Sequence, residues 1–334
     1  MATLNFNTIE FEKMPCVEGY ASVTGSKEKE GPLGELFDFC DIDNTFGQDT
    51  WEKSESVMQQ KVCCIAMDKL KLKPENIDFI FAGDLLNQCI SSSYGLRDFN
   101  IKFFGLYGAC STMAEGMILS ALTVDSGVAK RTINLSSSHF CSAERQFRFP
   151  LEYGSQRPPS AQWTVTGAGA VIMGERGKVK VKRATVGKIK DLGVDDINNM
   201  GAAMAPAAAQ TLIEFFNDTK TIPSDYDFIA TGDLGYVGYD IVKDLCKKEG
   251  YDLNNNYTDC GLIIYDREAQ DVHAGGSGCG CSASVLTSYI LPKMERGELK
   301  KVLFIGTGAL MSPVSFQQGE SIPSIAHLVE LSAE

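Results

Sequence analysis

An internal repeat constrains the fold of this chain more than any other feature. Residues 77–85, Ile-Asp-Phe-Ile-Phe-Ala-Gly-Asp-Leu, match residues 226–234, Tyr-Asp-Phe-Ile-Ala-Thr-Gly-Asp-Leu, at six of nine positions. A second match pairs residues 128–134 with residues 298–304 and follows the first in the same order. Two matches in one order indicate a duplicated chain. We therefore expect two halves of similar structure, residues 1–176 and 177–334.

Strands and helices are predicted to alternate within the halves. A buried strand over 77–82, a second over 103–109 and a helix over 113–124 with a 3.6-residue apolar period precede a strand over 132–136. This alternation implies an α/β fold with a mostly parallel sheet in each half. Extended loops are expected at 24–34, 141–162 and 252–280.

Charge and hydropathy exclude several classes of protein. The formal net charge is −12 and the pI is about 4.9, so a nucleic-acid partner, which needs a basic surface, is not expected. Residues 1–12 lack the basic and apolar regions of a signal peptide. Apolar runs such as residues 262–264 are far shorter than the roughly 20 residues that span a bilayer. We expect a soluble chain.

The cysteines indicate free thiols in a reducing compartment. The count is eleven, which is odd, and no secretion signal precedes them. The only close pairs are Cys63-Cys64 and Cys279-Gly-Cys281, and neither has the repeated spacing of a structural zinc site. With only three histidines in the chain, no metal cofactor is expected.

Cys110 has the sequence context of a nucleophile. It lies in Tyr107-Gly-Ala-Cys-Ser-Thr112, between a predicted strand and a predicted helix. Backbone N–H groups and the helix dipole at such a turn would stabilise a thiolate. The small neighbouring residues would leave the sulfur open to a ligand. The alternative is that Cys110 is a small buried hydrophobic residue, the commonest environment of a free cysteine.

A duplicated βαβ half with a cysteine at this turn resembles the thiolase and ketoacyl synthase superfamily. Within it, the chain resembles the stage V sporulation protein AD family over nearly its whole length. The matching motifs are Gly31-Pro-Leu-Gly34, Trp51-Glu-Lys53, Gly108-Ala-Cys-Ser111, Ser277-Gly-Cys-Gly-Cys-Ser282 and Gly306-Thr-Gly-Ala-Leu-Met-Ser-Pro313. The resemblance implies duplicated βαβαβαββ halves stacked as five layers, αβαβα. The Cys110 helix and the helix after Ser282 would lie in the middle, with strands 77–82 and 228–231 in separate sheets.

The family resemblance also implies a function. It is the binding of dipicolinic acid for uptake into the forespore, on the cytoplasmic side and beside membrane components of the spore channel. A homodimer is implied as well, and the apolar strand 102–109 is expected to pair with its symmetry mate. No cofactor is implied, and calcium would enter only as part of a chelate with the ligand.

Two departures from the superfamily argue against catalysis. Condensing enzymes place a histidine or asparagine in the second half, and the corresponding positions here are Gly232 and Ser277. Without these groups, proton transfer and oxyanion stabilisation lose their usual residues. His273 lies four residues from Ser277 and is either a substitute or a solvated bystander. The alternatives that remain are an acyl-thioester condensing enzyme that uses Cys110 and a scaffold whose pocket is a relic.

The candidate ligand site combines residues from several segments. His139 closes the predicted strand 132–136, whose end should face the same crevice as Cys110. Arginines suit planar carboxylates, although those that follow His139 could instead pair with Glu144 or Glu152. Asp84 and its repeat partner Asp233 end matching strands, and each either faces the crevice or caps the next turn or helix. The expected ligand-binding residues are Cys110, His139, Asp84, Arg145, Arg148 and Ser277, with Arg157 as a further candidate.

Overall fold

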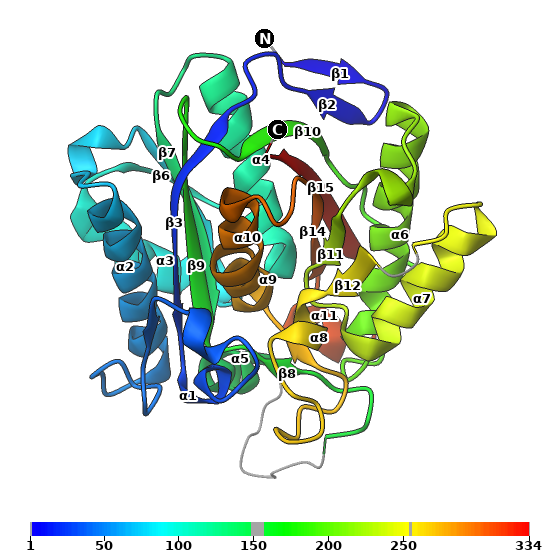
Figure 1. Ribbon diagram of the computed structural model, residues 1–334. Helices are drawn as coiled ribbons and strands as arrows, with labels where there is room; N and C mark the ends of the chain where they lie inside the picture. The colour runs from blue at the N-terminus through cyan, green and yellow to red at the C-terminus, as the bar shows by residue number, and fades with distance from the viewer. Residues whose placement is uncertain (1, 148–156, 254–255, 334) are drawn as a thin grey trace.

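The computed structural model describes residues 2–147, 157–253 and 256–333 and has five layers (Figure 1). Helices α2 (Trp51–Lys69) and α3 (Ile90–Leu96) cover one outer face. Helices α6 (Met200–Thr219) and α7 (Gly235–Lys248) cover the other outer face. Between the two β layers lie α4 (Thr112–Asp125), α9 (Cys279–Val285) and α10 (Leu291–Arg296). The predicted αβαβα fold class is confirmed.

The two halves have the same strand order. In the first half the order is β6 (Lys102–Gly105), β5 (Phe79–Gly83), β7 (Thr132–Ser138), β9 (Gly167–Gly174) and β3 (Cys16–Thr24). In the second half it is β12 (Tyr257–Asp259), β11 (Phe228–Thr231), β14 (Lys301–Ala309), β15 (Ser324–Ser332) and β10 (Lys180–Thr185). If each set is numbered along the chain, both read 3-2-4-5-1, which is the arrangement expected of a duplicated chain.

The sheet differs from the sequence prediction in two respects. Hydrogen bonds connect all ten of these strands, because Lys180 pairs with Cys16 where β10 meets β3. Strands β5 and β11 therefore lie in opposite arms of one connected sheet, and the expectation of separate sheets was wrong. Each arm is also mixed, because β9 and β15 run antiparallel to both of their neighbours. The last strand of each half returns beside the preceding one without a crossover helix, which makes the pair antiparallel.

Several predicted boundaries shift. The strand expected at 103–109 ends at Gly105, because residues 109–111 form a 3₁₀ turn ahead of α4. The loop expected at 141–162 begins with helix α5 (Phe140–Phe147). The remaining short elements are β1 (Thr3–Asn5), β2 (Thr8–Glu10), α1 (Ser26–Lys29), β4 (Phe39–Cys40), β8 (Trp163–Thr164), α8 (Cys260–Ile263), β13 (Gly276–Ser277) and α11 (Pro313–Gln317).

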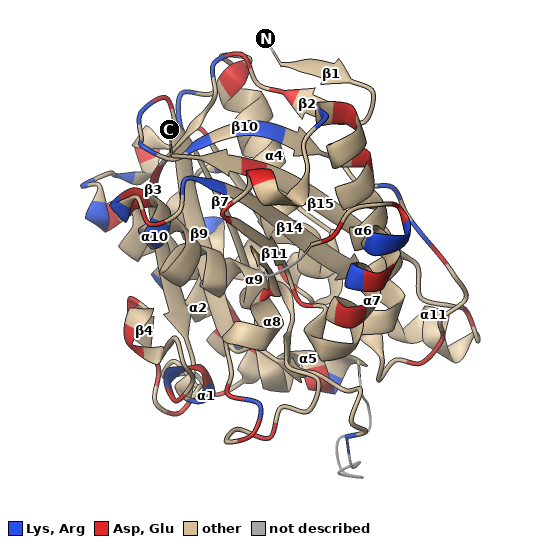
Figure 2. Ribbon diagram, turned by 45° about the vertical axis from the view of Figure 1, so that its right-hand side comes forward, with Lys and Arg blue, Asp and Glu red and all other residues tan. Residues whose placement is uncertain are grey.

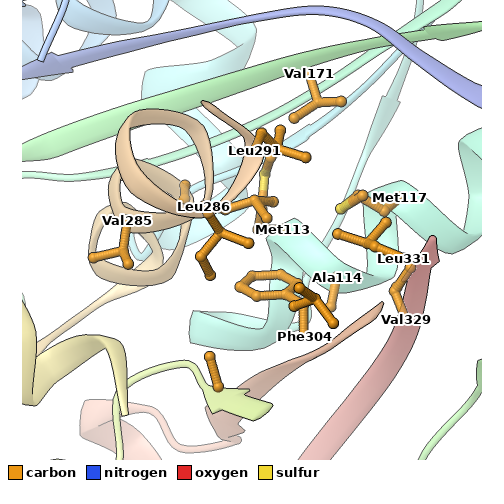
Figure 3. Close-up of a cluster of buried hydrophobic side chains, with 14 of the residues drawn as sticks. Met113, Ala114, Met117, Val171, Val285, Leu286, Leu291, Phe304, Val329 and Leu331 are labelled. Carbon is orange, nitrogen blue, oxygen red and sulfur yellow. The ribbon is translucent and has the colours of Figure 1, made fainter. Parts of the chain in front are cut away.

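The largest hydrophobic cluster fills the space between the two arms of the sheet (Figure 3). Met113 and Met117 of α4, Leu291 of α10 and Phe304 of β14 all belong to this cluster, and the Phe304 side chain is fully buried. Two further clusters lie under the outer helices, one beneath α2 and one beneath α6 and α7. The central cluster holds the N-termini of α4 and α9 in place, and the candidate site lies at those termini.

The charged residues are dispersed over the molecule. In the view of Figure 2, acidic and basic positions are interspersed along helices and loops. Within the described ranges, no helix is both long enough and apolar enough to cross a membrane.

Candidate functional site

A cavity of about 500 Å³ is lined by residues of both halves. It lies where the strands of the two arms end and where α4, α6 and α9 begin, which is the usual position of a ligand site in an α/β fold. Its walls are formed by residues 84–88, Tyr107, Ala109, Cys110, Ala143, Glu144, Gln146, Phe147, Thr164, Met200, Met204, Asp233, Ser277, residues 309–312 and Ser315. Three of the six predicted ligand residues, Cys110, Asp84 and Ser277, are in this set.

Close backbone packing holds Cys110 at the bottom of this cavity. The turn 109–111 lies directly against β14, where the chain has glycine at positions 306 and 308. A Cβ atom on Gly308 would lie 2.5 Å from the Gly108 carbonyl oxygen, and one on Gly306 would lie 2.9 Å from the Ser111 carbonyl oxygen. These glycines therefore fix how closely the Cys110 turn approaches the second half.

The Cys110 thiol is neutral. A hydrogen bond with Cys279, burial of the sulfur and the nearby Asp233 carboxyl raise the pKa of Cys110 well above its ordinary value. The expectation of a stabilised thiolate is therefore wrong, because the hydrogen bond with Cys279 and the burial of the sulfur outweigh the dipole of α4. Cys279, the first residue of α9, donates its own S–H to the Ala109 carbonyl oxygen at 3.0 Å. Both thiols serve as hydrogen-bond donors at the bottom of the cavity.

Asp233 both lines the cavity and caps a helix. It follows β11, as the repeat predicted, and its side chain is buried. One oxygen accepts from the Thr307 hydroxyl at 2.7 Å, and the other accepts from the Gly278 N–H at 2.9 Å, just before α9. Burial raises the pKa of Asp233 to about 6. The alternatives from the sequence were that Asp233 faces the crevice or caps the next turn or helix. Asp233 lines the cavity, and the next helix, α7, has Leu234 as its N-cap and no side-chain cap hydrogen bond.

Asp84 occupies the matching position in the first half. Ser92 of α3 donates to it through both its hydroxyl, at 2.6 Å, and its backbone N–H, at 2.8 Å. Behind it lies Glu55 of α2, which accepts from the Ser137 hydroxyl at 2.8 Å and the Ser142 hydroxyl at 2.7 Å. Burial raises the pKa of Asp84. Burial of Glu55, together with repulsion from the Asp84 carboxyl, raises the pKa of Glu55 to about 8.

His139 is not part of the cavity wall. Its Nε2 lies 2.9 Å from the Asn44 carbonyl oxygen, and its Nδ1 accepts from the Cys141 N–H at 3.1 Å. The ring packs against Trp51, with 5.4 Å between the ring centroids, and burial lowers the pKa of His139. With both nitrogens in use, the imidazole is a neutral structural group. No described residue of β7 lines the cavity, and the His139 side chain turns towards α2.

Neither Arg145 nor Arg157, the two predicted arginines that the structure describes, lines the cavity. Arg145 lies on α5 and pairs with Glu52 of α2. Arg157 donates to the carbonyl oxygen of Asp271 at 2.7 Å and stacks over the ring of Trp163. Arg148 lies outside the described residues. Among the described residues that line the cavity there is no Lys, Arg or His, whereas Asp84, Glu144 and Asp233 contribute carboxyl groups.

The two positions that carry catalytic groups in condensing enzymes offer none here. Ser277 of β13 reaches the cavity, but a Cβ atom on Gly232 would lie 3.0 Å from the Thr307 hydroxyl oxygen. His273 lies 2.9 Å from the Pro158 carbonyl oxygen through its Nδ1 and 3.0 Å from an Asp271 oxygen through its Nε2. All three histidines of the chain fall within the described ranges, and none lines the cavity.

The sequence reasoning missed the apolar wall of the cavity. Met200 and Met204 come from the first turns of α6, and Met311 comes from the segment after β14. Met200 and Met204 are four residues apart at the start of a capped helix, and this spacing could have indicated that they share one face. Pairs of this kind, however, more often belong to the hydrophobic core than to a ligand site. Within the described part of the chain, no group of three or more His, Cys, Asp or Glu residues is arranged to hold a metal ion.

Comparison with known proteins assigns the chain to a family. The model of the stage V sporulation protein AD family matches residues 5–332. The chain belongs to the stage V sporulation protein AD family. It is 46% identical to stage V sporulation protein AD of Bacillus subtilis (strain 168) over 318 residues, which cover 95% of this chain and 94% of that protein. The predicted resemblance is therefore confirmed.

Comparison with solved structures shows which proteins have the same fold as this chain. A 3-oxoacyl-(acyl-carrier-protein) synthase III from Aquifex aeolicus matches with a TM-score of 0.57 at 10% identity, covering 95% of this chain and 99% of that chain. A crystal structure of Xanthomonas campestris OleA matches with a TM-score of 0.61 at 14% identity, covering 97% and 99%. The chain thus has the thiolase-like fold of ketoacyl synthases, while its family is linked by name to sporulation.

Proposed function

We propose that this chain binds dipicolinate, free or as its calcium chelate, in the cavity beside Cys110 and does not convert it chemically. Resemblance to the sporulation family implies the ligand and a role in its uptake into the forespore, beside membrane components. The observation that carries the non-catalytic part is the environment of Cys110. The Cys110 thiol is neutral and is hydrogen-bonded to Cys279 and Asp233. The described cavity wall holds no imidazole that could accept the proton of this thiol.

The walls of the cavity suit a planar aromatic ligand with polar substituents. Its volume of about 500 Å³ lies within the range of small-molecule sites. Met200, Met204 and Met311 offer polarizable thioethers for the face of a ring. The hydroxyl groups of Thr164 and Ser277, on the paired strands β8 and β13, offer hydrogen bonds to carboxyl oxygens. The ligand would thus lie between an apolar side and a hydroxyl-lined side.

Titration of the purified chain with dipicolinate, with and without calcium, tests this proposal. Phthalate and benzoate serve as controls, because each has a six-membered aromatic ring with two carboxylates or one but no ring nitrogen. We expect saturable binding of dipicolinate at one site and at least about tenfold weaker binding of both controls. Equal binding of all three acids, or no binding of dipicolinate, would exclude the proposed ligand.

The second candidate function is acyl-thioester condensation. One observation favours it, because Cys110 lies at the start of a central helix in a fold shared with ketoacyl synthases. The neutral thiol and the positions Gly232 and Ser277 argue against it. Incubation with acetyl- and malonyl-thioesters should give no ketoacyl product above the level of a Cys110→Ala variant. Slow acylation of the thiol alone would not count as turnover.

We also propose that two copies pair along β6. Within the described residues this strand is paired on one side only, by β5, and it exposes Phe103 and Phe104. An apolar edge strand left open favours aggregation, whereas a twofold partner would cover it. Light scattering at micromolar concentration should give the mass of a dimer, and a monomer would contradict this pairing.

A further inference from the structure

The cavity wall presents the carboxyl groups of Asp84, Glu144 and Asp233 to a ligand that is itself an acid, and the two aspartates are the most buried of the three. Asp84 and Asp233 are repeat partners, 149 residues apart, and are 5% and 1% exposed. Among the described residues that line the cavity, none carries a positive side chain. The start of α9, which would attract an anion, is already capped by Asp233 through the Gly278 N–H. Among the described lining residues, a dicarboxylate entering this space therefore meets carboxyl groups and no positive side chain.

Each of these aspartates has a hydroxyl partner that can reverse its hydrogen bond. The Thr307 hydroxyl lies 2.7 Å from Asp233, and the Ser92 hydroxyl lies 2.6 Å from Asp84. A hydroxyl donates to a carboxylate and accepts from a carboxylic acid with the heavy atoms in the same place. The hydroxyl bond of each aspartate can therefore persist in either protonation state. The backbone N–H groups of Gly278 at Asp233, and of Leu86 and Ser92 at Asp84, can only donate. Asp259, behind Asp233, has a hydroxyl partner of the same kind, Thr231 at 2.7 Å, together with three backbone N–H donors, but it does not line the cavity.

The groups around the two aspartates disfavour a second negative charge. The titratable groups that face Asp233 are Cys110, Cys279, Cys281, Asp259 and Cys260. Those that face Asp84 are Glu55, Cys89, Tyr107 and Cys279. All of them are acids, thiols or a phenol, and none of these described neighbours is a cation. Ionisation of either aspartate beside a bound anion thus has no charged partner to stabilise it.

We propose that the cavity binds a dicarboxylate anion together with a proton, which is taken up chiefly by Asp233 and shared with Asp84. The proton converts a carboxylate at the cavity wall into a hydrogen-bond donor, either to the ligand or to Thr307. The inference rests on the proposed function, since it concerns the same ligand in the same cavity. It adds that the affinity for the free anion depends on pH.

The direction of this dependence follows from linkage. Burial raises the pKa of Asp233 to about 6 in the unliganded protein, and a bound anion raises this pKa further. Between these two values the free protein is ionised and the complex is protonated, so binding takes up a proton. The affinity for the anion should therefore fall by up to about tenfold per pH unit as the pH rises above about 6.

Calorimetric titration of the full chain with dipicolinate, in the presence of EDTA, measures this proton directly. Two buffers of different ionisation enthalpy at pH 7 give the number of protons taken up per ligand. We expect about one proton for the unmodified chain and less than half of that for Asp233→Asn. The charge-matched control is Glu320→Gln, because Glu320 is exposed and lies outside the cavity wall, and it should keep the full uptake.

Three outcomes separate the inference from the proposed function. Binding without proton uptake, at equal affinity near pH 6 and pH 8, would overturn the inference and leave dipicolinate binding intact. No binding at any pH would overturn the proposed function itself. Proton uptake that persists in both Asp233→Asn and Asp84→Asn would place the proton elsewhere and also refute the assignment. Thermal melting of each variant checks its fold, and the unmodified chain alone decides whether a proton is taken up.

Discussion

The two halves of the molecule share one strand order, yet the aspartates at matching positions in the two halves have different hydrogen-bond partners. In the first half, Asp84 is held by Ser92 of the helix that follows it, with the side chains of Glu55 and Gln59 behind. In the second half, Asp233 is held by Thr307 of the adjacent strand and by backbone N–H at α9. The duplicated backbone fixes where each carboxyl lies. Its chemistry is decided by neighbours that the repeat does not copy.

The largest difference between the halves should appear in the central core. Phe304 on β14 and Asn134 on β7 are repeat partners, and both are fully buried. Phe304→Ala should lower the free energy of unfolding by about 3–5 kcal/mol, because it leaves a large apolar cavity. Asn134→Ala should cost only about 1 kcal/mol, because the side-chain oxygen has no hydrogen-bond partner among the described residues. Urea denaturation measures both, and equal costs would contradict the comparison.

A smaller difference should separate the two carboxyls that lie behind the cavity. Asp259 accepts three backbone N–H bonds and one from the Thr231 hydroxyl, whereas the described donors to Glu55 are the hydroxyls of Ser137 and Ser142. Asp259→Asn should cost about 1–3 kcal/mol, because its amide group would face a donor that cannot reverse. Glu55→Gln should cost about 1 kcal/mol or less. Thermal unfolding at constant pH measures both variants, and a Glu55→Gln variant less stable than Asp259→Asn would refute this interpretation.

A still smaller effect is expected at His139, and it should fall on stability alone. His139→Ala removes two hydrogen bonds with Asn44 and Cys141 and should cost about 1–2 kcal/mol. Its dipicolinate affinity should stay within about twofold of the unmodified chain, because the ring does not line the cavity. Ser277→Ala should have the opposite effect: its melting temperature should be unchanged, and its affinity for dipicolinate should be about three- to tenfold weaker. A clear loss of dipicolinate affinity in His139→Ala would show that His139 does contact the ligand.

The sequence predicted the duplicated fold, the position of Cys110 and the paired aspartates, because these follow from local patterns and the repeat. It did not predict the protonation state of Cys110, since Cys279 and Asp233 reach it from the other half of the chain. The strand-end rule placed His139 near the crevice, but Trp51 and Asn44, about 90 residues earlier, turn its ring away. Side-chain direction of this kind depends on contacts between distant segments, which a local pattern does not contain.

The most direct test of the account fills the cavity and leaves the rest of the molecule unchanged. Ala309 ends β14 at the cavity wall, and Ala309→Phe would place a ring where the ligand is expected. Ala269→Phe is the matched control, because Ala269 is exposed and does not line the cavity. Dipicolinate titration should show at least about a hundredfold loss of affinity for Ala309→Phe and no change for Ala269→Phe. Unchanged affinity in a folded Ala309→Phe variant would show that this cavity is not the ligand site.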